Sequence, residues 1–370
     1  MFKKTLAAAA ILGAFAGSAF AADVTLYGVI DTGFNYTHVD KTGAADTDTF
    51  QMKSGQNSGP RFGLKGTEDL GNGLKVGFNL ENSFNSDDGT LDASGRLFHR
   101  ESLVWVSGAF GEISFGRTGA LDAGTGRYGQ MGGAAHAFST GWDNIAKTSL
   151  VFKGQGSRMD NTVTYQTPKF GGVSVLAQYS FKKDNVDADG AAIKTVEGES
   201  SSDRYYAVGV KGDFGALSSA LVVSSNNVAS CDGTTRTYNG DDPLAVSARV
   251  SYDFGFIKPM IAAQYYDGDE TATNLKGYGV TLGAIAPVFG GKLKASVGYG
   301  DYDTVKPTDN KDTYTAYTFG LGYEYSLSKR TMVYTAAGYS EQKDEYKASA
   351  QKADQKTKTT EVMLGLVHTF

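Results

Sequence analysis

Two stretches of the sequence match patterns that bind nucleotides or metal ions. Residues 124–129 (GTGRYG) fit the dinucleotide string G-x-G-x-x-G, which holds a pyrophosphate only between a strand and a following helix. An irregular Gly-rich stretch follows here, so we expect no nucleotide cofactor. Residues 185–190 (NVDADG) resemble the start of a calcium loop, but position twelve is Val196 where that loop requires Glu. We interpret it as a solvated acidic loop.

The sequence contains no motif that indicates an enzyme. The histidines His38, His99, His136 and His368 show no metal-ligand spacing, and no G-x-S-x-G nucleophile motif is present. Cys231 is the only cysteine, so no internal disulfide can form. We therefore predict no catalytic, metal or cofactor site.

Alternation of apolar and polar residues recurs along the whole chain. In residues 292–299 the apolar side chains Leu293, Ala295, Val297 and Tyr299 alternate with lysine, serine and glycine. Successive side chains of a strand point to opposite faces, so each such segment has one apolar face. The alternation persists for about ten residues, the length that a tilted strand needs to cross a bilayer.

The start of the chain indicates export. Lys3 and Lys4 precede an apolar run over residues 6–16, and the small residues around Ala21 suit a cleavage site. We predict a signal peptide at residues 1–21 and a single domain at residues 22–370. The rest of the chain lacks an apolar run of the ~18 residues that a spanning helix needs, so a membrane protein of this sequence must be a closed barrel.

The connections between the alternating segments differ in length. Short ones contain Gly or Asp, as in residues 69–73 and 213–215, whereas polar stretches such as residues 40–56, 182–202, 226–242 and 341–358 are long. Short turns at one end and long loops at the other are typical of outer-membrane barrels. Counting the segments predicts 16 antiparallel strands, a number that leaves an aqueous interior.

The net charge of the chain is −5, which argues against a nucleic-acid partner because such proteins carry strongly basic surfaces.

Charged residues within the strands should face this interior. Phe62 and Leu64 take the apolar face of one segment, which turns Arg61 and Lys65 the other way. In the next segment Leu74, Val76, Phe78 and Leu80 turn Lys75 and Glu81 inward. An Arg or Lys at the lipid midplane costs about 2–4 kcal/mol, which favours the lumen for these charges.

Several motifs, in collinear order, resemble the general porins of Gram-negative bacteria, specifically the trimeric type of β-proteobacteria. The resemblance covers the chain beyond the signal peptide and ends on a terminal Phe similar to the barrel-assembly signal of outer-membrane proteins. The matching segments are residues 24–31 (VTLYGVID), 61–75 (RFGLKGTEDLGNGLK), 95–100 (GRLFHR), 115–117 (FGR), 160–165 (DNTVTY), 327–331 (LSKRT) and 365–370 (GLVHTF).

This resemblance implies a homotrimer of barrels in the cell outer membrane, each with a long third loop, here residues 119–156, folded into the lumen. It also implies a basic cluster on the wall, which by motif is Arg61, Arg100 and Arg158, with Arg96 as a further member. The loop would contribute Asp122 and Arg127, and we add the inward-facing Lys75 to the residues predicted for the constriction. With more cations than acids, the narrowest point should weakly prefer anions.

The function expected from these features is passive diffusion of small hydrophilic solutes and inorganic ions through a water-filled channel. Membrane lipid and lipopolysaccharide would surround the barrel. The alternative is an outer-membrane barrel enzyme of the lipase or protease type, although the strands offer no paired nucleophile and base. A surface adhesin is compatible with the polar loops as well.

Overall fold

The structure is a computed structural model. The predicted signal peptide and most of the calcium-like segment lie outside the residues it describes. Those residues are 23–93, 95–140, 142–185, 196–199, 202–227, 230–232, 235–237, 242–268, 275–304, 312–346 and 354–370.

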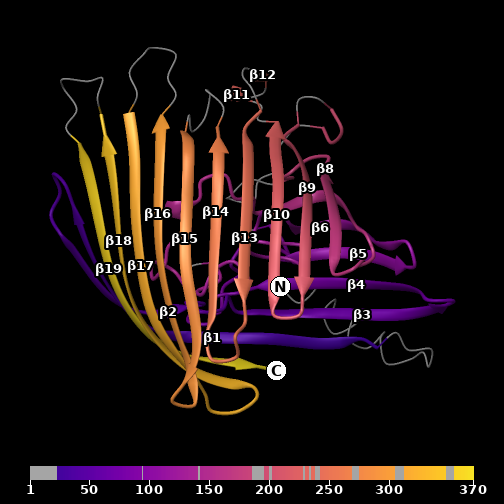
Figure 1. Cartoon of the computed structure of the whole chain (residues 1–370), viewed down its shortest axis with the longest axis horizontal. Coiled ribbons are helices and arrows are strands. Elements are labelled where there is room, and N and C mark those ends of the chain that lie inside the picture. Colours follow the sequence, from indigo (N-terminus) through magenta and orange to yellow (C-terminus); the bar gives the residue numbers. More distant parts are fainter. Residues whose placement is uncertain are drawn as a thin grey trace, which may run out of the picture.

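Antiparallel strands make up nearly all of the described structure (Figure 1), and one helical turn lies in the third long connection. None of the described helical segments is long and apolar enough to span a membrane. The elements are β1 (Thr25–Lys41), β2 (Thr47–Ser54), β3 (Arg61–Gly71), β4 (Leu74–Ser83), β5 (Glu101–Gly108), β6 (Gly111–Gly119), α2 (Thr148–Val151), β7 (Arg158–Gln166), β8 (Val173–Ser180), β9 (Arg204–Phe214), β10 (Leu217–Asn227), β11 (Ser230–Asp232), β12 (Thr235–Thr237), β13 (Leu244–Tyr252), β14 (Lys258–Asp267), β15 (Leu275–Val288), β16 (Gly291–Thr304), β17 (Asp312–Ser326), β18 (Thr331–Glu345) and β19 (Gln355–Thr369).

The large sheet closes on itself, because its first strand is hydrogen-bonded to its last. β1 pairs antiparallel with β19, from Val29 opposite Thr369 to Lys41 opposite Thr357. β2 and β3 pair with successive stretches of β1 and so share one position in the wall. The 17 strands of this sheet therefore form a closed barrel of 16 positions, and the strand number predicted from the sequence is confirmed.

The two faces of the wall differ in polarity, as the alternation predicts. On β9, the outward side chains Tyr206 and Val208 are 41% and 56% exposed, whereas the intervening Tyr205 and Ala207 are buried. Exposed Val, Leu, Phe and Tyr recur at the outward positions of the other strands. Such an outer face matches the hydrocarbon of a bilayer, and the opposite face encloses the lumen.

Two of the connections predicted to be long loops are largely strand. β1 continues to Lys41 and β2 begins at Thr47, so residues 40–56 mostly form a hairpin. At the other end of the chain, β18 and β19 extend into residues 341–358. The apolar alternation stops there, but the backbone pairing continues, and outward ion pairs such as Lys358–Asp40 (2.8 Å) link neighbouring strands.

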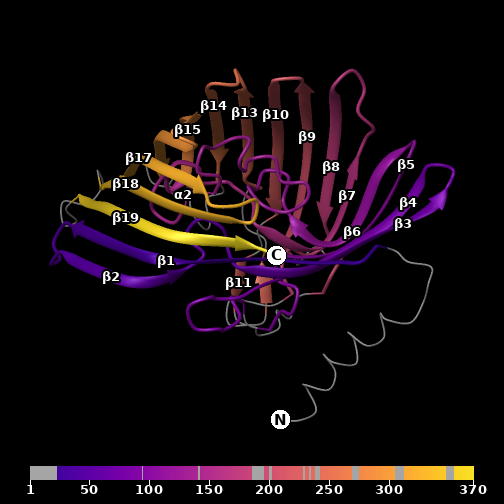
Figure 2. The same ribbon diagram turned by 90° about the horizontal axis from the view of Figure 1, so that it is seen from below.

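Residues 120–157 connect β6 to β7 and lie against the inner face of the wall (Figure 2). Their partners occupy inward positions on strands far away in sequence. The Tyr302 hydroxyl donates to the carbonyl oxygen of Val151 (2.7 Å), and Asn144 Nδ2 donates to a Glu361 carboxylate oxygen (2.6 Å). This connection therefore occupies part of the lumen.

Apolar packing holds this inner segment to the wall. Phe138, Trp142 and Ile145 are buried against inward side chains that include Tyr334 and Met363. Burial of each large apolar side chain contributes roughly 1.5–3 kcal/mol.

Glycine on the wall allows the close approach. A Cβ at Gly279 would collide with the backbone oxygen of Val151, and one at Gly338 with that of Ile145. The small residues of β15 and β18 thus leave room for the inner segment.

Candidate functional site

A cavity of about 400 Å³ lies on the inner face, between the wall and the inner segment. Its wall residues come from the first half of the barrel, and Gly126 and Arg127 come from residues 120–157. It is lined by Tyr27, Arg61, Lys65, Asn79, Glu81, Arg100, Glu101, Gly126, Arg127 and Arg158. We refer to it as the arginine cavity.

The charges of the arginine cavity do not balance. Five of its side chains are basic and two, Glu81 and Glu101, are acidic, an excess of three positive charges. A low-dielectric wall concentrates the field of such an excess in the water-filled space that it encloses. The cavity therefore has the electrostatics of an anion-attracting site.

Glu81 on β4 is the acidic centre of the wall cluster. Arg100 Nε donates to its Oε1 (2.5 Å), Arg61 Nε lies 3.6 Å from its Oε2, and the Tyr27 hydroxyl donates to Oε2 (2.9 Å). Arg61 also donates to the carbonyl oxygen of Gly59 (2.9 Å). One carboxylate thus orients two guanidinium groups.

Arg158, at the start of β7, is less compensated than these two arginines. Its Nε is buried and has no hydrogen-bond partner among the described residues. Arg158 therefore contributes a positive charge to the cavity that no hydrogen bond from Nε to a described residue compensates.

The inner segment places Arg127 against β5 and β6, beside this cluster. Its guanidinium donates two hydrogen bonds to Glu112 of β6 (2.8 and 2.7 Å) and lies 4.7 Å from the Trp105 ring centroid. Its backbone N–H donates to Glu101 Oε1 (2.6 Å), which anchors the segment beside the cavity. Together these contacts fix the position of a charge that a free loop would leave mobile.

The imidazole of His99 responds to the same charges. His99 lies in the connection between β4 and β5, beside the arginines. Burial, and then the positive charges of Arg117 and Arg158, lower the pKa of His99 to about 4. His99 is therefore neutral at physiological pH and adds no charge to the cavity.

Three residues predicted for the site lie elsewhere. Asp122 is buried against β9 and β10, where it accepts hydrogen bonds from Tyr205 (3.0 Å), Ser224 (2.5 Å) and the Gly156 backbone (3.1 Å). It anchors the base of the inner segment instead of lining the channel.

Arg96 and Lys75 are the other two. Arg96 donates two hydrogen bonds to the Asp160 carboxylate (2.6 and 2.8 Å). This ion pair holds the Arg96 guanidinium outside the cavity. Lys75 shares the inward register of Glu81 on β4, but it pairs with Asp69 beside a short turn. The six residues between them correspond to about 20 Å of strand, too far to reach the cavity.

Sequence reasoning did not include Glu81, Glu101 and Glu112 in the site. The signal for Glu81 was available, because the alternation of β4 turns it inward. Glu101 and Glu112 could not be assigned, because their partner Arg127 belongs to a segment whose path has no periodic pattern.

A second group of inward cations lies nearer the short turns. Lys258, Lys292 and Lys294 line a cavity of about 340 Å³ with Asp253 and Glu324. Lys294 Nζ donates to Glu324 (2.5 Å), and it also lies 4.5 Å from the ring centroid of a tryptophan in the inner segment. The basic character of the lumen thus extends beyond the arginine cavity.

Comparisons with known proteins agree with this architecture. Residues 7–345 match the family described as Gram-negative porin. An outer membrane porin protein of Bordetella pertussis is 34% identical, with 100% of each chain covered. Outer membrane porin protein 32 of Delftia acidovorans is 33% identical, covering 92% of this chain and 90% of its own. The solved anion-selective porin from Comamonas acidovorans is 29% identical, with a TM-score of 0.67 and coverage of 94% and 99%.

A closed barrel with an apolar outer face and a charged, partly open interior defines a multi-pass channel of the outer membrane. The chain belongs to the Gram-negative porin family. The family and the relatives indicate a channel rather than the enzyme that we considered as an alternative.

Proposed function

We propose that this porin passes small hydrophilic solutes and inorganic ions by passive diffusion, with a preference for anions set at the arginine cavity. The observation that carries the proposal is the excess of three positive charges in that cavity. The solved structure from Comamonas acidovorans is that of an anion-selective porin, which supports the same direction.

Arg61, Arg100 and Arg158 supply the wall side of the proposed constriction, and Arg127 supplies the loop side. Glu81 orients two of the wall arginines and reduces their field. Selectivity then arises from size exclusion between wall and loop and from electrostatic bias, with no covalent step.

We also propose that the porin assembles as a homotrimer surrounded by membrane lipid and lipopolysaccharide. The family resemblance implies the trimer. The outer face of β1 and β2 offers a surface for a second copy, because Phe34 and Phe50 stack there at 5.9 Å and Phe50 is 73% exposed. Side chains that stay so exposed on a barrel wall favour contact with protein or lipid over water.

Single-channel recording in a planar bilayer with a salt gradient tests the proposal. Conductance steps in triplets with a reversal potential favouring chloride would support a trimeric anion-preferring pore. A reversal potential favouring potassium would retain the channel but refute the role of the arginine cavity. Single steps from folded protein would argue against the trimer.

A further inference from the structure

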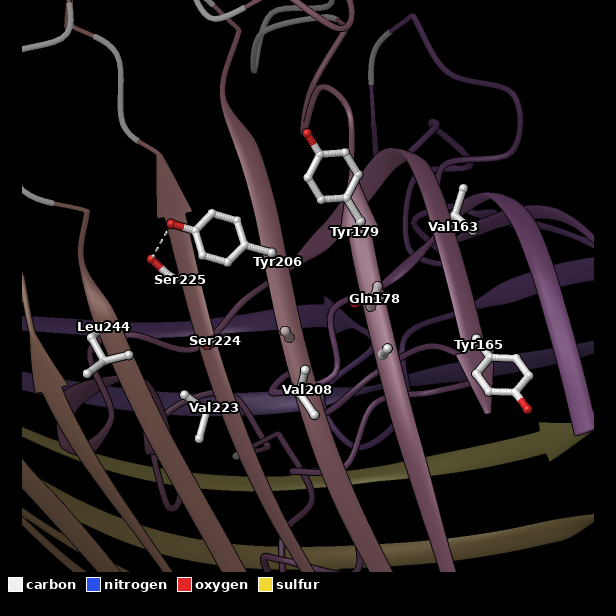
Figure 3. A pocket seen from close by; sticks show the side chains of 12 residues that line it. Val163, Tyr165, Gln178, Tyr179, Tyr206, Val208, Val223, Ser224, Ser225 and Leu244 are labelled. Carbon is white, nitrogen blue, oxygen red and sulfur yellow. Dashed lines mark hydrogen bonds between the residues drawn. The ribbon is translucent and has the colours of Figure 1, made fainter. Parts of the chain in front are cut away.

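An apolar groove of about 520 Å³ crosses the outer face of the barrel, from β7 to β13 (Figure 3). Exposed Tyr, Val, Ala and Leu side chains from five strands border it in two rows. The backbone pairing aligns Val163, Tyr179, Tyr206, Ser225 and Leu244 in one row, and Tyr165, Ala177, Val208 and Val223 in the other. The second row is lowest at Ala177, between Tyr165 and Val208, because the Ala177 side chain is only a methyl group.

The groove lies toward the long connections of the barrel. Tyr206 is two residues from the start of β9, Leu244 begins β13, and Tyr179 lies one residue before the end of β8. Long connections face the cell exterior in outer-membrane barrels, so the groove opens into the outer leaflet. That leaflet consists largely of lipopolysaccharide.

Polar groups border the groove at its exterior end. The Tyr206 hydroxyl donates to Asp242 (2.5 Å) and accepts from Ser225 (3.2 Å). Tyr179 carries its hydroxyl at the same end (Figure 3). Tyrosines at this level form the aromatic girdle, where the ring contacts acyl chains and the hydroxyl contacts headgroups.

A cation lies just beyond this girdle. Arg204 is two residues before Tyr206 on β9 and therefore shares its outward face. Its guanidinium forms no ion pair with another described residue. An unpaired guanidinium at headgroup level suits a phosphate, which it can bind with two parallel hydrogen bonds.

We propose that this groove binds one acyl chain of lipopolysaccharide and that Arg204 pairs with a phosphate of its lipid A headgroup. The inference rests on the proposed association with lipopolysaccharide and assigns its site. At ~30 Å³ for a water-sized group, 520 Å³ holds about 17 such groups, the bulk of one chain and not of a whole lipid.

The groove is separate from the surface proposed for the trimer. β9 occupies the eighth of the 16 wall positions counted from β1, so the groove faces away from Phe34 and Phe50. Its occupant in the assembled porin is therefore lipid and not a second copy.

Native mass spectrometry of the refolded porin with bisphosphorylated lipid A in detergent micelles tests this. Lipid A should be retained with defined stoichiometry. Ala177→Trp, which fills the groove, should weaken binding by about tenfold or more. Arg204→Gln should weaken it by about tenfold, and this loss should vanish with dephosphorylated lipid A. Ala295→Trp places the same indole on an outward position of β16 and should bind normally.

Three results would overturn the proposal. Equal retention of phosphatidylglycerol would mean that the groove takes any phospholipid. Unchanged binding by Ala177→Trp would place the lipid elsewhere. Loss of the oligomer in Ala177→Trp would make the groove a protein interface. Conductance of the same variants separates these results from failure of the channel function, because neither substitution faces the lumen.

Discussion

Replacement of Arg158 by Gln tests the proposed origin of anion preference most directly. Arg158 contributes one of the five basic side chains of the arginine cavity, and its Nε has no partner among the described residues. The substitution therefore removes a full positive charge while leaving the hydrogen bond from Arg100 to Glu81 in place.

The size of the effect follows from the dimensions of the cavity. A sphere of 400 Å³ has a radius of about 4.6 Å, so an ion at its centre lies about 6 Å from a charged wall group. At that distance a unit charge contributes about 0.7 kcal/mol in water, and roughly 0.4 kcal/mol in about 0.1 M salt. Because anions lose this energy and cations gain it, the anion-to-cation permeability ratio should fall by about four- to tenfold.

The assay is the reversal potential of single channels in a salt gradient, with Lys75→Gln as the matched control. Lys75 also faces inward, but it lies about 20 Å along β4 from Glu81, or about two Debye lengths in this salt. Its substitution should change the ratio little. An unchanged ratio in Arg158→Gln, or equal effects of the two substitutions, would refute the reasoning.

Three further predictions concern the other parts of the site. Glu81→Gln removes one of the two cavity carboxylates, so the permeability ratio should rise by about fourfold or more, and a fall in the reversal-potential measurement would contradict the charge assignment. Burial raises the pKa of the Asp122 carboxyl above its ordinary 3.8. The protonated carboxyl therefore contributes to stability below pH 3.8, and this contribution is lost as the pH rises through the pKa of the folded state. Asp122→Asn should remove this part of the pH dependence of Tm, and an identical pH profile in the variant would exclude the buried carboxyl as its source. Gly338→Ala should displace the inner segment, because its Cβ meets the Ile145 backbone, and should change conductance in a barrel of unchanged heat-modifiability; wild-type conductance would mean that the segment yields without narrowing or widening the channel.

The barrel itself was predictable because its signal is local and repeated. Each strand carries its own alternation, so Tyr205 and Tyr206 could be assigned to opposite faces without knowledge of any partner strand. The ends of strands were less predictable. β2 and the outer parts of β18 and β19 lack an apolar face, and only the pairing of their backbones shows that they are strands.

The site was predictable in part. The cavity brings together Arg61, Arg100, Arg158 and Arg127, as the family motifs and the long loop suggested. Asp122 was assigned to the channel because it is an acid in an inward loop. Its carboxylate is instead hydrogen-bonded to Tyr205 and Ser224, which are more than eighty positions away in the chain.

The sequence by itself therefore determined the class of structure, the outward apolar face and the inward direction of the strand charges, because side-chain direction in a strand depends only on position within a period of two. The partner of each charge was decided by the tertiary structure alone. Arg61 and Arg100 share Glu81, and Arg127 meets Glu112, only because strand register and the path of the inner segment bring them together. The net charge at the proposed narrowest point of the channel depends on these ion pairs, because a charged side chain affects the field there only if it reaches the same cavity.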